Sequence, residues 1–499
     1  MMAEHQPLND LNEIKRRVDE TVEAEHRAYA TEQEPCREQD ADPIPEQIAA
    51  ERKPETEPEQ AEGDSSKTDV VESLNKKHAV IMLAGKCLIL NHVIDPTTNR
   101  QDINFSGLQD FRGKYQNRKI PITINSHTKQ ISIAEIWLNS PDRKEYQDIV
   151  FDPSHKENPG VYNLWQGFAI MPKRGSWVRM KQHIRQIICS NDPETFKYLM
   201  AWMARLVQDP GSKRPGVAVV LRGKQGVGKG IFVINFGTIF GSHFRQIISH
   251  HLVAGRFNAH FKDALLVFVD EGFWGGDKQA EGILKGMITE EFITVEPKGK
   301  EAFTLKNHCN FIFASNSTWV VPASEEERRF FVMDVAESKM GDIAYFKALN
   351  EEMENGGREA MLHDLLHINI TGVNLWGFPR RDALLDQIIL TWPAEKKFWY
   401  ETLRAGYIRN NLNGNSASTV WPDTIDCDVL YSLYSEFATT VGERFKSIDK
   451  VFGKKFKELC PAIERKQHGN GLWYYRLPPL NVCRDKLESL VKIKINWNG

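Results

Sequence analysis

The middle of the chain alternates two hydrophobic patterns. Between residues 212 and 335, short continuous apolar runs are separated by stretches whose apolar positions recur at helical spacing. Continuous apolar runs of strand length are typical of strands covered on both faces, as in a parallel sheet flanked by helices. The alternation predicts an α/β core with strands at residues 216–221, 265–269, 310–314 and 330–335.

The flanking segments carry different patterns. The stretch up to residue 175 is mixed and predicts strands at residues 78–83 and 87–90, and apolar residues then follow helical spacing up to the Asp209-Pro210-Gly211 break. Helices predominate again after about residue 340. We therefore predict a mixed, then helical N-terminal domain at 76–207, an α/β core at 208–370 and a largely helical C-terminal domain at 380–499.

Charge separates the first 75 residues from the rest. They hold 21 acidic and 8 basic side chains, whereas residues 76–499 hold 46 acidic and 56 basic ones. A tail rich in Glu, Gln and Pro with few aromatic residues buries too little apolar surface to order itself, so we expect residues 1–75 to be disordered. The spacing of Leu8, Leu11, Ile14, Val18 and Val22 leaves a short partner-binding helix as an alternative.

Cysteine usage and hydropathy limit the cellular setting. The seven cysteines are scattered without a Cys-x-x-Cys pair, which argues against a zinc site or a disulfide framework. No apolar run approaches the ~18 residues of a membrane span, and the acidic N-terminus does not resemble a secretory signal. We expect a cytoplasmic protein of a bacterial host or a phage, with no membrane partner.

A glycine-rich loop follows the first core strand. Its residues are Gly223, Lys224, Gln225, Gly226, Val227, Gly228, Lys229 and Gly230. Glycines at this spacing let backbone N–H groups surround an anion, a following helix adds its positive end, and Lys229 reaches the terminal phosphates. The usual loop has Ser or Thr after the lysine to hold Mg²⁺, so Gly230 removes one metal ligand.

Two acids follow the second core strand. Asp270 is expected to hold Mg²⁺, directly or through water, and Glu271 to orient or deprotonate the water that attacks the γ-phosphate. A strand that ends in two acids is often structural. Its place about forty residues after the phosphate loop favours the catalytic interpretation.

The third and fourth core strands add polar residues. Asn316, just after residues 310–314, is a candidate sensor of the γ-phosphate, and the alternative is a turn-forming Asn. Arg328 and Arg329 precede the fourth strand and suggest a finger inserted into a neighbouring subunit's site, against a simple salt bridge to Glu325–Glu327.

Two further segments carry lysines on predicted surface elements. Lys298 and Lys300 lie at the tip of a predicted hairpin between the acids and the amide, where they could grip a DNA backbone or form an ordinary solvated turn. In the C-terminal domain, Lys450, Lys454 and Lys457 face outward on a predicted helix that precedes a basic hairpin. This pattern fits a winged helix that contacts DNA, and the alternative is a solvated lysine face.

The order of these motifs resembles a known family. Phosphate loop, Asp-Glu strand, Lys-Gly-Lys hairpin, Asn-tipped strand and Arg-Arg-Phe look like the superfamily 3 helicases of the AAA+ class, in particular the helicase half of phage and plasmid primase-helicases and of marine-phage polymerase-helicases. The resemblance covers about residues 130–370. It implies a P-loop AAA+ core, ATP and Mg²⁺ as cofactors, and a hexameric ring. For the residues, it implies that Lys229 binds the phosphates, that Asp270 and Glu271 bind the metal and the water, and that Asn316 is the sensor. It further implies Arg328 or Arg329 as the finger that enters the neighbouring subunit, and Lys298 or Lys300 as the contact with DNA.

The chain departs from that family in lacking a recognisable primase or polymerase. Asp426 and Asp428 are the one pair with the spacing of metal carboxylates in the folded part, but they precede an apolar helix whose dipole they complement. We therefore expect a separate primase or polymerase as partner.

The preferred interpretation is an ATP-dependent helicase or translocase acting on single-stranded or forked DNA as a ring. The alternatives are a nucleotide-binding DNA scaffold without turnover, motivated by Gly230, and an ATPase in anti-phage defence or packaging.

Overall fold

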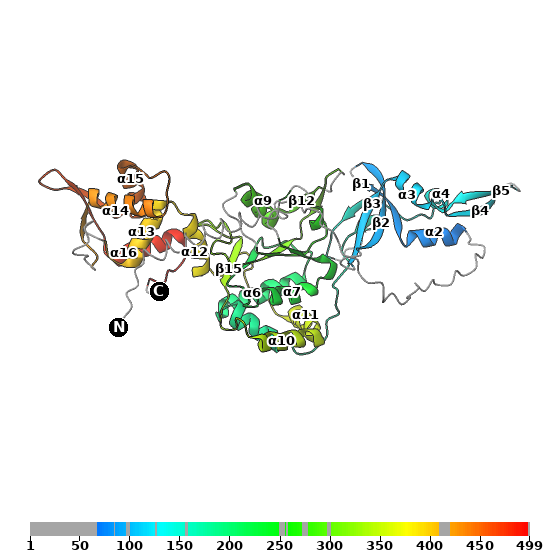
Figure 1. The fold of residues 1–499 in the computed structure, drawn as a ribbon, viewed down its shortest axis with the longest axis horizontal. Coiled ribbons are helices and arrows are strands. Elements are labelled where there is room, and N and C mark those ends of the chain that lie inside the picture. Colours follow the sequence, from blue (N-terminus) through cyan, green and yellow to red (C-terminus); the bar gives the residue numbers. More distant parts are fainter. Residues whose placement is uncertain are drawn as a thin grey trace, which may run out of the picture.

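In the computed structural model, a central body lies between two smaller lobes (Figure 1). The structure describes residues 67–83, 85–95, 100–124, 127–154, 158–248, 255, 258–271, 278–296, 301–408 and 420–497. No helix within these ranges is long and apolar enough to cross a membrane.

The N-terminal lobe is built on an antiparallel meander with one short parallel strand added. Its sheet has the order β3-β2-β1-β6, and its helices and the hairpin β4–β5 lie on one side. The elements are α2 (Lys67–Asn75), β1 (His78–Leu83), β2 (Lys86–Asp95), β3 (Arg100–Ser106), α3 (Leu108–Tyr115), β4 (Lys119–Ile124), β5 (His127–Ser132), α4 (Ile133–Leu138) and β6 (Glu145–Tyr146).

Helix α2 corrects the predicted extent of the tail. The sequence predicts disorder up to residue 75, but Val70, Val71 and Leu74 of α2 are buried. They pack in a small core with Phe111 and Trp137. Three apolar positions at helical spacing give this short segment a face to bury, and this gain outweighs the polar composition around it.

Alternation along β1 divides the lobe's packing between two cores. Val80 belongs to the small core with α2, whereas Ala79 and Ile81 belong to the large core of the central body. Successive side chains of a strand point to opposite faces. The sheet is therefore covered on both faces, and it connects the lobe with the central body.

The central body contains the predicted parallel sheet. Its strand order is β10-β11-β14-β9-β15, and all four neighbouring pairs are parallel. The strands are β9 (Ala218–Arg222), β10 (Phe244–Ile247), β11 (Leu266–Asp270), β14 (Asn310–Ser315) and β15 (Phe330–Asp334). The α/β prediction is confirmed, and β10 is a strand that the sequence analysis did not single out.

Helices cover both faces of this sheet (Figure 1). One face carries α6 (Pro193–Gln208), α7 (Lys229–Thr238), α10 (Ile343–Glu352) and α11 (Arg358–His367), and the other carries α9 (Lys278–Thr289) with the antiparallel pair β12 (Phe292–Val295) and β13 (Phe303–Lys306). Smaller elements complete the body: β7 (Asp148–Val150), β8 (Val161–Asn163), α5 (Val178–His183), single 3₁₀ turns at Gly241–His243 and Ala259–Phe261, and π-helical turns at Ile184–Ile188 and Met353–Gly357.

The helical pattern predicted over residues 177–207 is interrupted in the structure. Helix α5 ends in its π-helical turn, and α6 begins anew at Pro193 with Asp192 as its cap. Ser190 and Asn191 both have positive φ, so the helical conformation is interrupted between the π-helical turn and α6. Apolar spacing alone does not reveal this break, because both helices bury faces in the same core.

The C-terminal lobe combines helices with a three-stranded antiparallel sheet of order β16-β18-β17. Helix α12 (Asp382–Thr391) packs beside β15 and leads into the lobe. The elements of the lobe are α13 (Ala394–Ala405), β16 (Thr424–Asp426), α14 (Cys427–Thr440), α15 (Asp449–Leu459), β17 (Glu464–Gln467), β18 (Trp473–Arg476) and α16 (Leu480–Val491). The helix and hairpin predicted at residues 449–475 are confirmed.

Candidate nucleotide site

The carboxyl edge of the central sheet brings the predicted motifs together. Strand β14 lies between β9 and β11, so the carboxyl ends of these parallel strands are neighbours. The connection leaving β9 runs toward β10, and the one leaving β14 runs the other way to β15. Ligands of open α/β sheets bind where neighbouring connections diverge in this way.

The glycine-rich loop joins β9 to α7. Gly226 and Gly228 have φ of +80° and +98°. A Cβ on Gly228 would lie 2.5 Å from Cε1 of His183 and 2.7 Å from Cε1 of Phe346, so only glycine fits there. The Gly223 N–H donates to the Ser315 carbonyl over 3.1 Å, which anchors the loop to the end of β14.

Lys229 is the first residue of α7, and its side chain folds back into the loop. Its Nζ donates to the Gly223 carbonyl and, over 2.9 Å, to the Lys224 carbonyl. Burial lowers the pKa of Lys229, and the charges of Glu271 and Asp270 act in the opposite direction. The ammonium group therefore lies within electrostatic reach of both predicted acids.

The two acids stand at the end of β11. Asp270 is half-buried, and Gln246 Nε2 on β10 lies 3.5 Å from its Oδ2. Glu271 is exposed and has φ of +59°, in the left-handed region that non-glycine residues rarely adopt. Such a conformation persists where surrounding structure imposes it, and it is frequent at functional sites.

A cavity of about 960 Å³ opens between this edge and α10. One wall is formed by loop residues 225–230, Ile231 and Ile234 of α7, and the two acids. The opposite wall comes from α10 and the turn after it: Ile343, Phe346, Lys347, Asn350, Glu351 and Glu354. The cavity has the size of a small-molecule site and pairs a polar, glycine-lined side with apolar side chains.

His183 supports the loop from behind, and sequence reasoning missed it. The ring is fully buried; Nε2 lies 3.2 Å from the Gly228 carbonyl oxygen and Nδ1 lies 3.1 Å from the Tyr345 hydroxyl. Burial lowers the pKa of His183 to about 4, so the ring is neutral at pH 7. A single histidine on an apolar helix carries no signal in the sequence that would connect it with Gly228.

Asn316 lies at the same edge but outside the cavity wall. It follows Ser315, whose Cα pairs with Arg222 at the end of β9, and its side chain is exposed. The residues that line the cavity do not include it. The sheet thus brings the amide beside the loop, in a position from which it can face a ligand that extends out of the cavity.

Arg328 and Arg329 lie just before β15, at the amino ends of the strands. The Arg329 carbonyl accepts from Ala218 N at the start of β9, whereas the loop begins after its end. A strand of this length spans about 16 Å. The backbone of the arginines is therefore about one strand length from the loop of the same chain.

The local environment of these arginines does not match the salt-bridge alternative. Buried Glu327 accepts from the backbone N–H groups of Arg328 and Arg329, over 3.0 and 2.6 Å, and Glu325 pairs with Lys396. Within the described ranges, no ion pair joins either guanidinium to Glu325–Glu327. Arg328 is exposed, and Nε of Arg329 is buried without a hydrogen-bond partner in this part of the structure.

The predicted lysine hairpin is described only in its strands. β12 and β13 pair antiparallel as expected, but Lys298 and Lys300 lie outside the described residues. The Asn258 side chain anchors the hairpin: its Nδ2 donates to the Thr294 carbonyl over 2.8 Å, and its Oδ1 accepts from Glu296 N over 2.8 Å.

Asp426 and Asp428 flank the start of α14, as the sequence predicts. Oδ1 of Asp426 lies 3.2 Å from His468 Nε2. Among the residues that the structure describes, no group of three or more His, Cys, Asp or Glu side chains is arranged to hold a metal ion.

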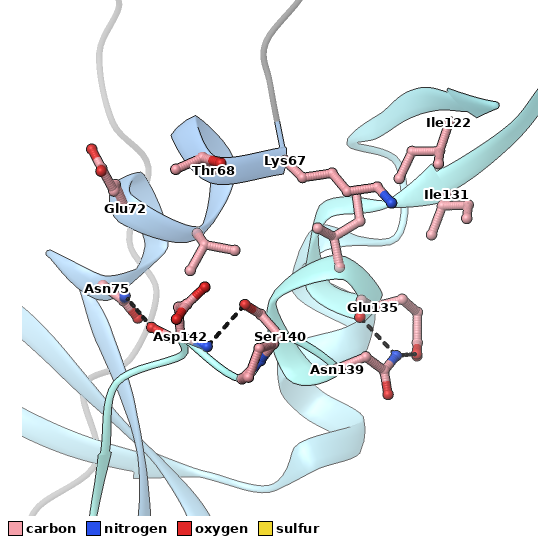
Figure 2. Close-up of a pocket in the computed structure, with 13 residues that line it drawn as sticks. Lys67, Thr68, Glu72, Asn75, Ile122, Ile131, Glu135, Asn139, Ser140 and Asp142 are labelled. Atoms are coloured by element: carbon pink, nitrogen blue, oxygen red, sulfur yellow. Dashed lines mark hydrogen bonds between the residues drawn. The ribbon is translucent and has the colours of Figure 1, made fainter. Parts of the chain in front are cut away.

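A second hollow, of about 580 Å³, lies in the N-terminal lobe between α2, α4 and the β4–β5 hairpin (Figure 2). Figure 2 shows Lys67 extending toward Ile122 and Ile131, while polar groups on the other side bond to one another. Asn75 donates to the Asp142 carbonyl over 2.9 Å, and Asp142 N donates to Ser140 over 3.2 Å. These contacts brace α2 against the turn after α4.

The core of the chain is similar in sequence to known proteins. Residues 221–329, from the end of β9 to the arginine pair, match a family of unknown function (DUF5906). The DNA primase-polymerase of Nitratiruptor phage NrS-1 is 32% identical over 146 residues, which are 29% of this chain. The match spans only 20% of that relative's length.

Solved structures give a broader match in fold. The apo structure of the NrS-1 C-terminal region aligns with a TM-score of 0.57 at 18% identity and covers 83% of this chain and 99% of that one. An A-form apo structure of the same region gives a TM-score of 0.56 at 18% identity, with 83% and 100% covered. The chain therefore shares its mixed α/β fold, including the parallel sheet, with the C-terminal region of a phage DNA primase-polymerase.

Proposed function

We propose that the chain is an ATP-driven DNA helicase or translocase of a phage- or plasmid-type replication system that works as a ring. Residues 208–370 would be its P-loop AAA+ core, and residues 380–499 a winged-helix-like domain. One observation carries the proposal: the glycine-rich loop, Lys229, Asp270 and Glu271 line one cavity of about 960 Å³ at the carboxyl edge of a parallel sheet. Similarity to a DNA primase-polymerase supports the replication setting.

The cavity suits a nucleoside triphosphate. Backbone N–H groups of the loop and the start of α7 favour phosphate oxygens, and Lys229 neutralises their charge. Ile234, Ile343 and Phe346 give the same cavity an apolar portion that a base could contact. One part of the cavity thus suits phosphates and another part suits an apolar base.

The acids suit Mg²⁺ held jointly with phosphates. Mg²⁺ in nucleotide sites takes one or two carboxylates and completes its shell with waters and phosphate oxygens. Asp270, with Gln246 beside its Oδ2, is the residue that would hold it. When bound, the ion would neutralise charge on the terminal phosphates.

Hydrolysis then rests on positioning. Glu271 faces the cavity and orients or deprotonates the attacking water, while Lys229 holds the γ-phosphate in line. His183 keeps Gly228 in its left-handed conformation, so the loop is shaped before the nucleotide binds. Asn316 lies outside the cavity wall, so its proposed role as a sensor requires the γ-phosphate or the water to reach the neighbouring strand end.

The ring follows from the two edges of the sheet. Arg328 and Arg329 lie at the far end of the sheet from their own loop, and the exposed Arg328 is available to a neighbouring subunit. Head-to-tail contacts that close on themselves give rings, and a hexamer is expected. Lys298 and Lys300 would contact DNA, and a separate primase or polymerase would supply primers.

ATP turnover by the full-length chain tests the proposal. We expect single-stranded DNA to stimulate hydrolysis, and Lys229→Ala and Glu271→Gln each to reduce it by at least about 100-fold. Lys197→Ala, an exposed lysine of α6, is the matched control. Forked DNA should be unwound with ATP by an assembly whose mass exceeds the monomer. Absence of stimulated turnover in the wild-type chain would refute the enzyme assignment.

Gly230 supports a second candidate, a nucleotide-binding DNA scaffold without turnover. Position 230 has no hydroxyl for Mg²⁺, yet a Cβ built there meets no atom within 4 Å, so a serine fits. Gly230→Ser should strengthen Mg²⁺-dependent nucleotide binding severalfold. If the wild-type chain binds ATP tightly without hydrolysis and Gly230→Ser restores turnover, the scaffold is the better assignment.

A further inference from the structure

The C-terminal lobe presents a basic face that the ATP-binding core does not account for. Helix α15 packs across one face of the β16-β18-β17 sheet: its buried Phe456 lies 5.4 Å from the ring of Tyr475 on β18. Phe452 stacks on Tyr434 of α14 at 4.5 Å, so α15 is fixed from two sides. A helix held in this way presents its outer side chains in a constant geometry.

Three lysines occupy the outer side of α15. Lys450, Lys454 and Lys457 are exposed, and no salt bridge involves them among the described residues. Their spacing places them along one stripe of the helix, over about 10 Å of its length. Lys455 differs, because it turns inward and pairs with buried Glu395 at 2.8 Å. Lys455 thus neutralises Glu395, whereas the three lysines of the stripe face solvent.

The hairpin continues this basic stripe. Arg465 pairs across the strands with Tyr475, the residue that α15 covers, so Arg465 lies on the same side of the sheet as α15. Its guanidinium lies 4.5 Å from the ring of Trp473, which is 43% exposed. The cation is therefore held in place beside the helix rather than free to move.

Lys466 belongs to the other face. Successive strand residues point to opposite sides, and Lys466 pairs with Glu464 at 2.7 Å. The sequence groups all basic residues of the hairpin together, whereas the structure separates Arg465 from Lys466. The acids Asp449 and Glu458 lie next to the ends of the lysine stripe in sequence and do not divide it.

We propose that Lys450, Lys454 and Lys457 of α15, with Arg465 of β17, bind the phosphate backbone of double-stranded DNA. Residues 449–476 carry seven Lys or Arg and three Asp or Glu. The exposed side of a single helix fits the major groove, which is about 12 Å wide, and a hairpin beside it reaches the adjoining backbone. This surface is outside the nucleotide cavity and would anchor the chain on the duplex ahead of unwinding.

Salt-dependent binding of the full-length chain to a blunt duplex tests the proposal. The variant Lys450→Ala/Lys454→Ala/Lys457→Ala should bind the duplex at least tenfold more weakly, and its slope of log K against log salt should fall by about 2 to 3 units, since each lost phosphate contact removes about 0.9. The matched control is Lys129→Ala/Lys173→Ala/Lys197→Ala, which removes the same charge from exposed positions elsewhere.

Three outcomes would overturn the proposal: an unchanged affinity and slope, an equal loss in the control, or a loss confined to single-stranded DNA. ATP turnover without DNA should be unaltered in the lysine variant, which shows that it is folded. The result does not depend on the proposed motor: if the wild-type chain hydrolysed no ATP, the helicase assignment would fail while duplex binding through α15 would still stand or fall by the salt slope.

Discussion

The two edges of the central sheet have opposite characters. At the carboxyl edge, the loop of β9 and the acids of β11 line one cavity, and the end of β14 anchors the loop. At the amino edge, Arg328 and Arg329 stand before β15, and neither lines that cavity. The first edge therefore holds most residues of the proposed nucleotide site, and the second holds the two arginines proposed to complete it.

The difference explains why the proposed site would need residues from two chains. In a parallel sheet all carboxyl ends meet on one side, so residues before a strand and residues after it lie at opposite ends of the sheet. No local rearrangement reverses this. If the arginines take part in hydrolysis, they act in the cavity of a neighbouring chain.

The largest effect is expected at the amino edge. Loss of an arginine that stabilises transition-state charge costs about 10³-fold or more in kcat, and KM for ATP changes little because the ground state is held by the loop. We expect this from Arg329→Lys, which keeps the charge but not the planar fork, or from Arg328→Ala. Steady-state kinetics provide the measurement.

The control for this prediction is Arg404→Ala, an exposed arginine of α13. Equal kcat in the wild-type chain and in both arginine variants would remove the arginines from the reaction and reduce the amino edge to a structural role.

At the carboxyl edge, two glycines of one loop should respond differently to alanine. Both Gly226 and Gly228 have positive φ, but a Cβ on Gly226 meets no atom within 4 Å, whereas one on Gly228 meets His183 and Phe346. Gly226→Ala should cost about 1 kcal/mol of backbone strain, and Gly228→Ala about 4 kcal/mol, because overpacking adds to the strain. Urea unfolding compares them, and equal losses would mean that His183 does not brace the loop.

Acid should weaken both edges. Burial lowers the pKa of His183, at the loop, and of His308, just before β14, to about 4 each. Between pH 6.5 and 4 the unfolded chain binds protons that these two folded-state rings exclude. Their contribution to stability therefore falls as pH decreases through this window, and it does not change with pH above it. Below pH 4, each histidine lowers the free energy of unfolding by up to roughly 3 kcal/mol relative to its value at pH 7.

Unfolding free energies at several pH values between 4 and 8 measure this effect. Replacing His183 by Gln should remove its share of the pH dependence of the unfolding free energy and leave the share of His308. A slope that is unaffected by this replacement would contradict the assignment.

The sequence predicts the strands and the loop of the carboxyl edge better than the side chains that pack behind the loop. Strand periodicity and the glycine spacing indicate β9, β11, β14 and the loop, because these are local patterns. His183, Tyr345 and Phe346 escape prediction, since they come from α5 and α10 and meet Gly228 only through tertiary packing. The opposite directions of the loop and the arginines likewise follow from strand order, which a single sequence does not give.

Errors in the flanking regions have similar causes. The acidic composition of residues 1–75 predicts disorder and so misses helix α2, although Val70, Val71 and Leu74 show helical spacing in the sequence. The Arg465 and Lys466 pair looks uniform in the sequence, and only the pairing of β17 with β18 assigns each side chain to a face.

A mixture of two inactive variants tests the central claim that one site takes its edges from two chains. Lys229→Ala retains both arginines, and the double variant Arg328→Ala/Arg329→Lys retains an intact loop. In a ring mixed at equal amounts, about a quarter of the interfaces therefore pair an intact loop with intact arginines. The account predicts that DNA-stimulated ATP hydrolysis returns to about a quarter of the wild-type rate. A mixture no more active than its components, in assemblies shown to contain both chains, would contradict it.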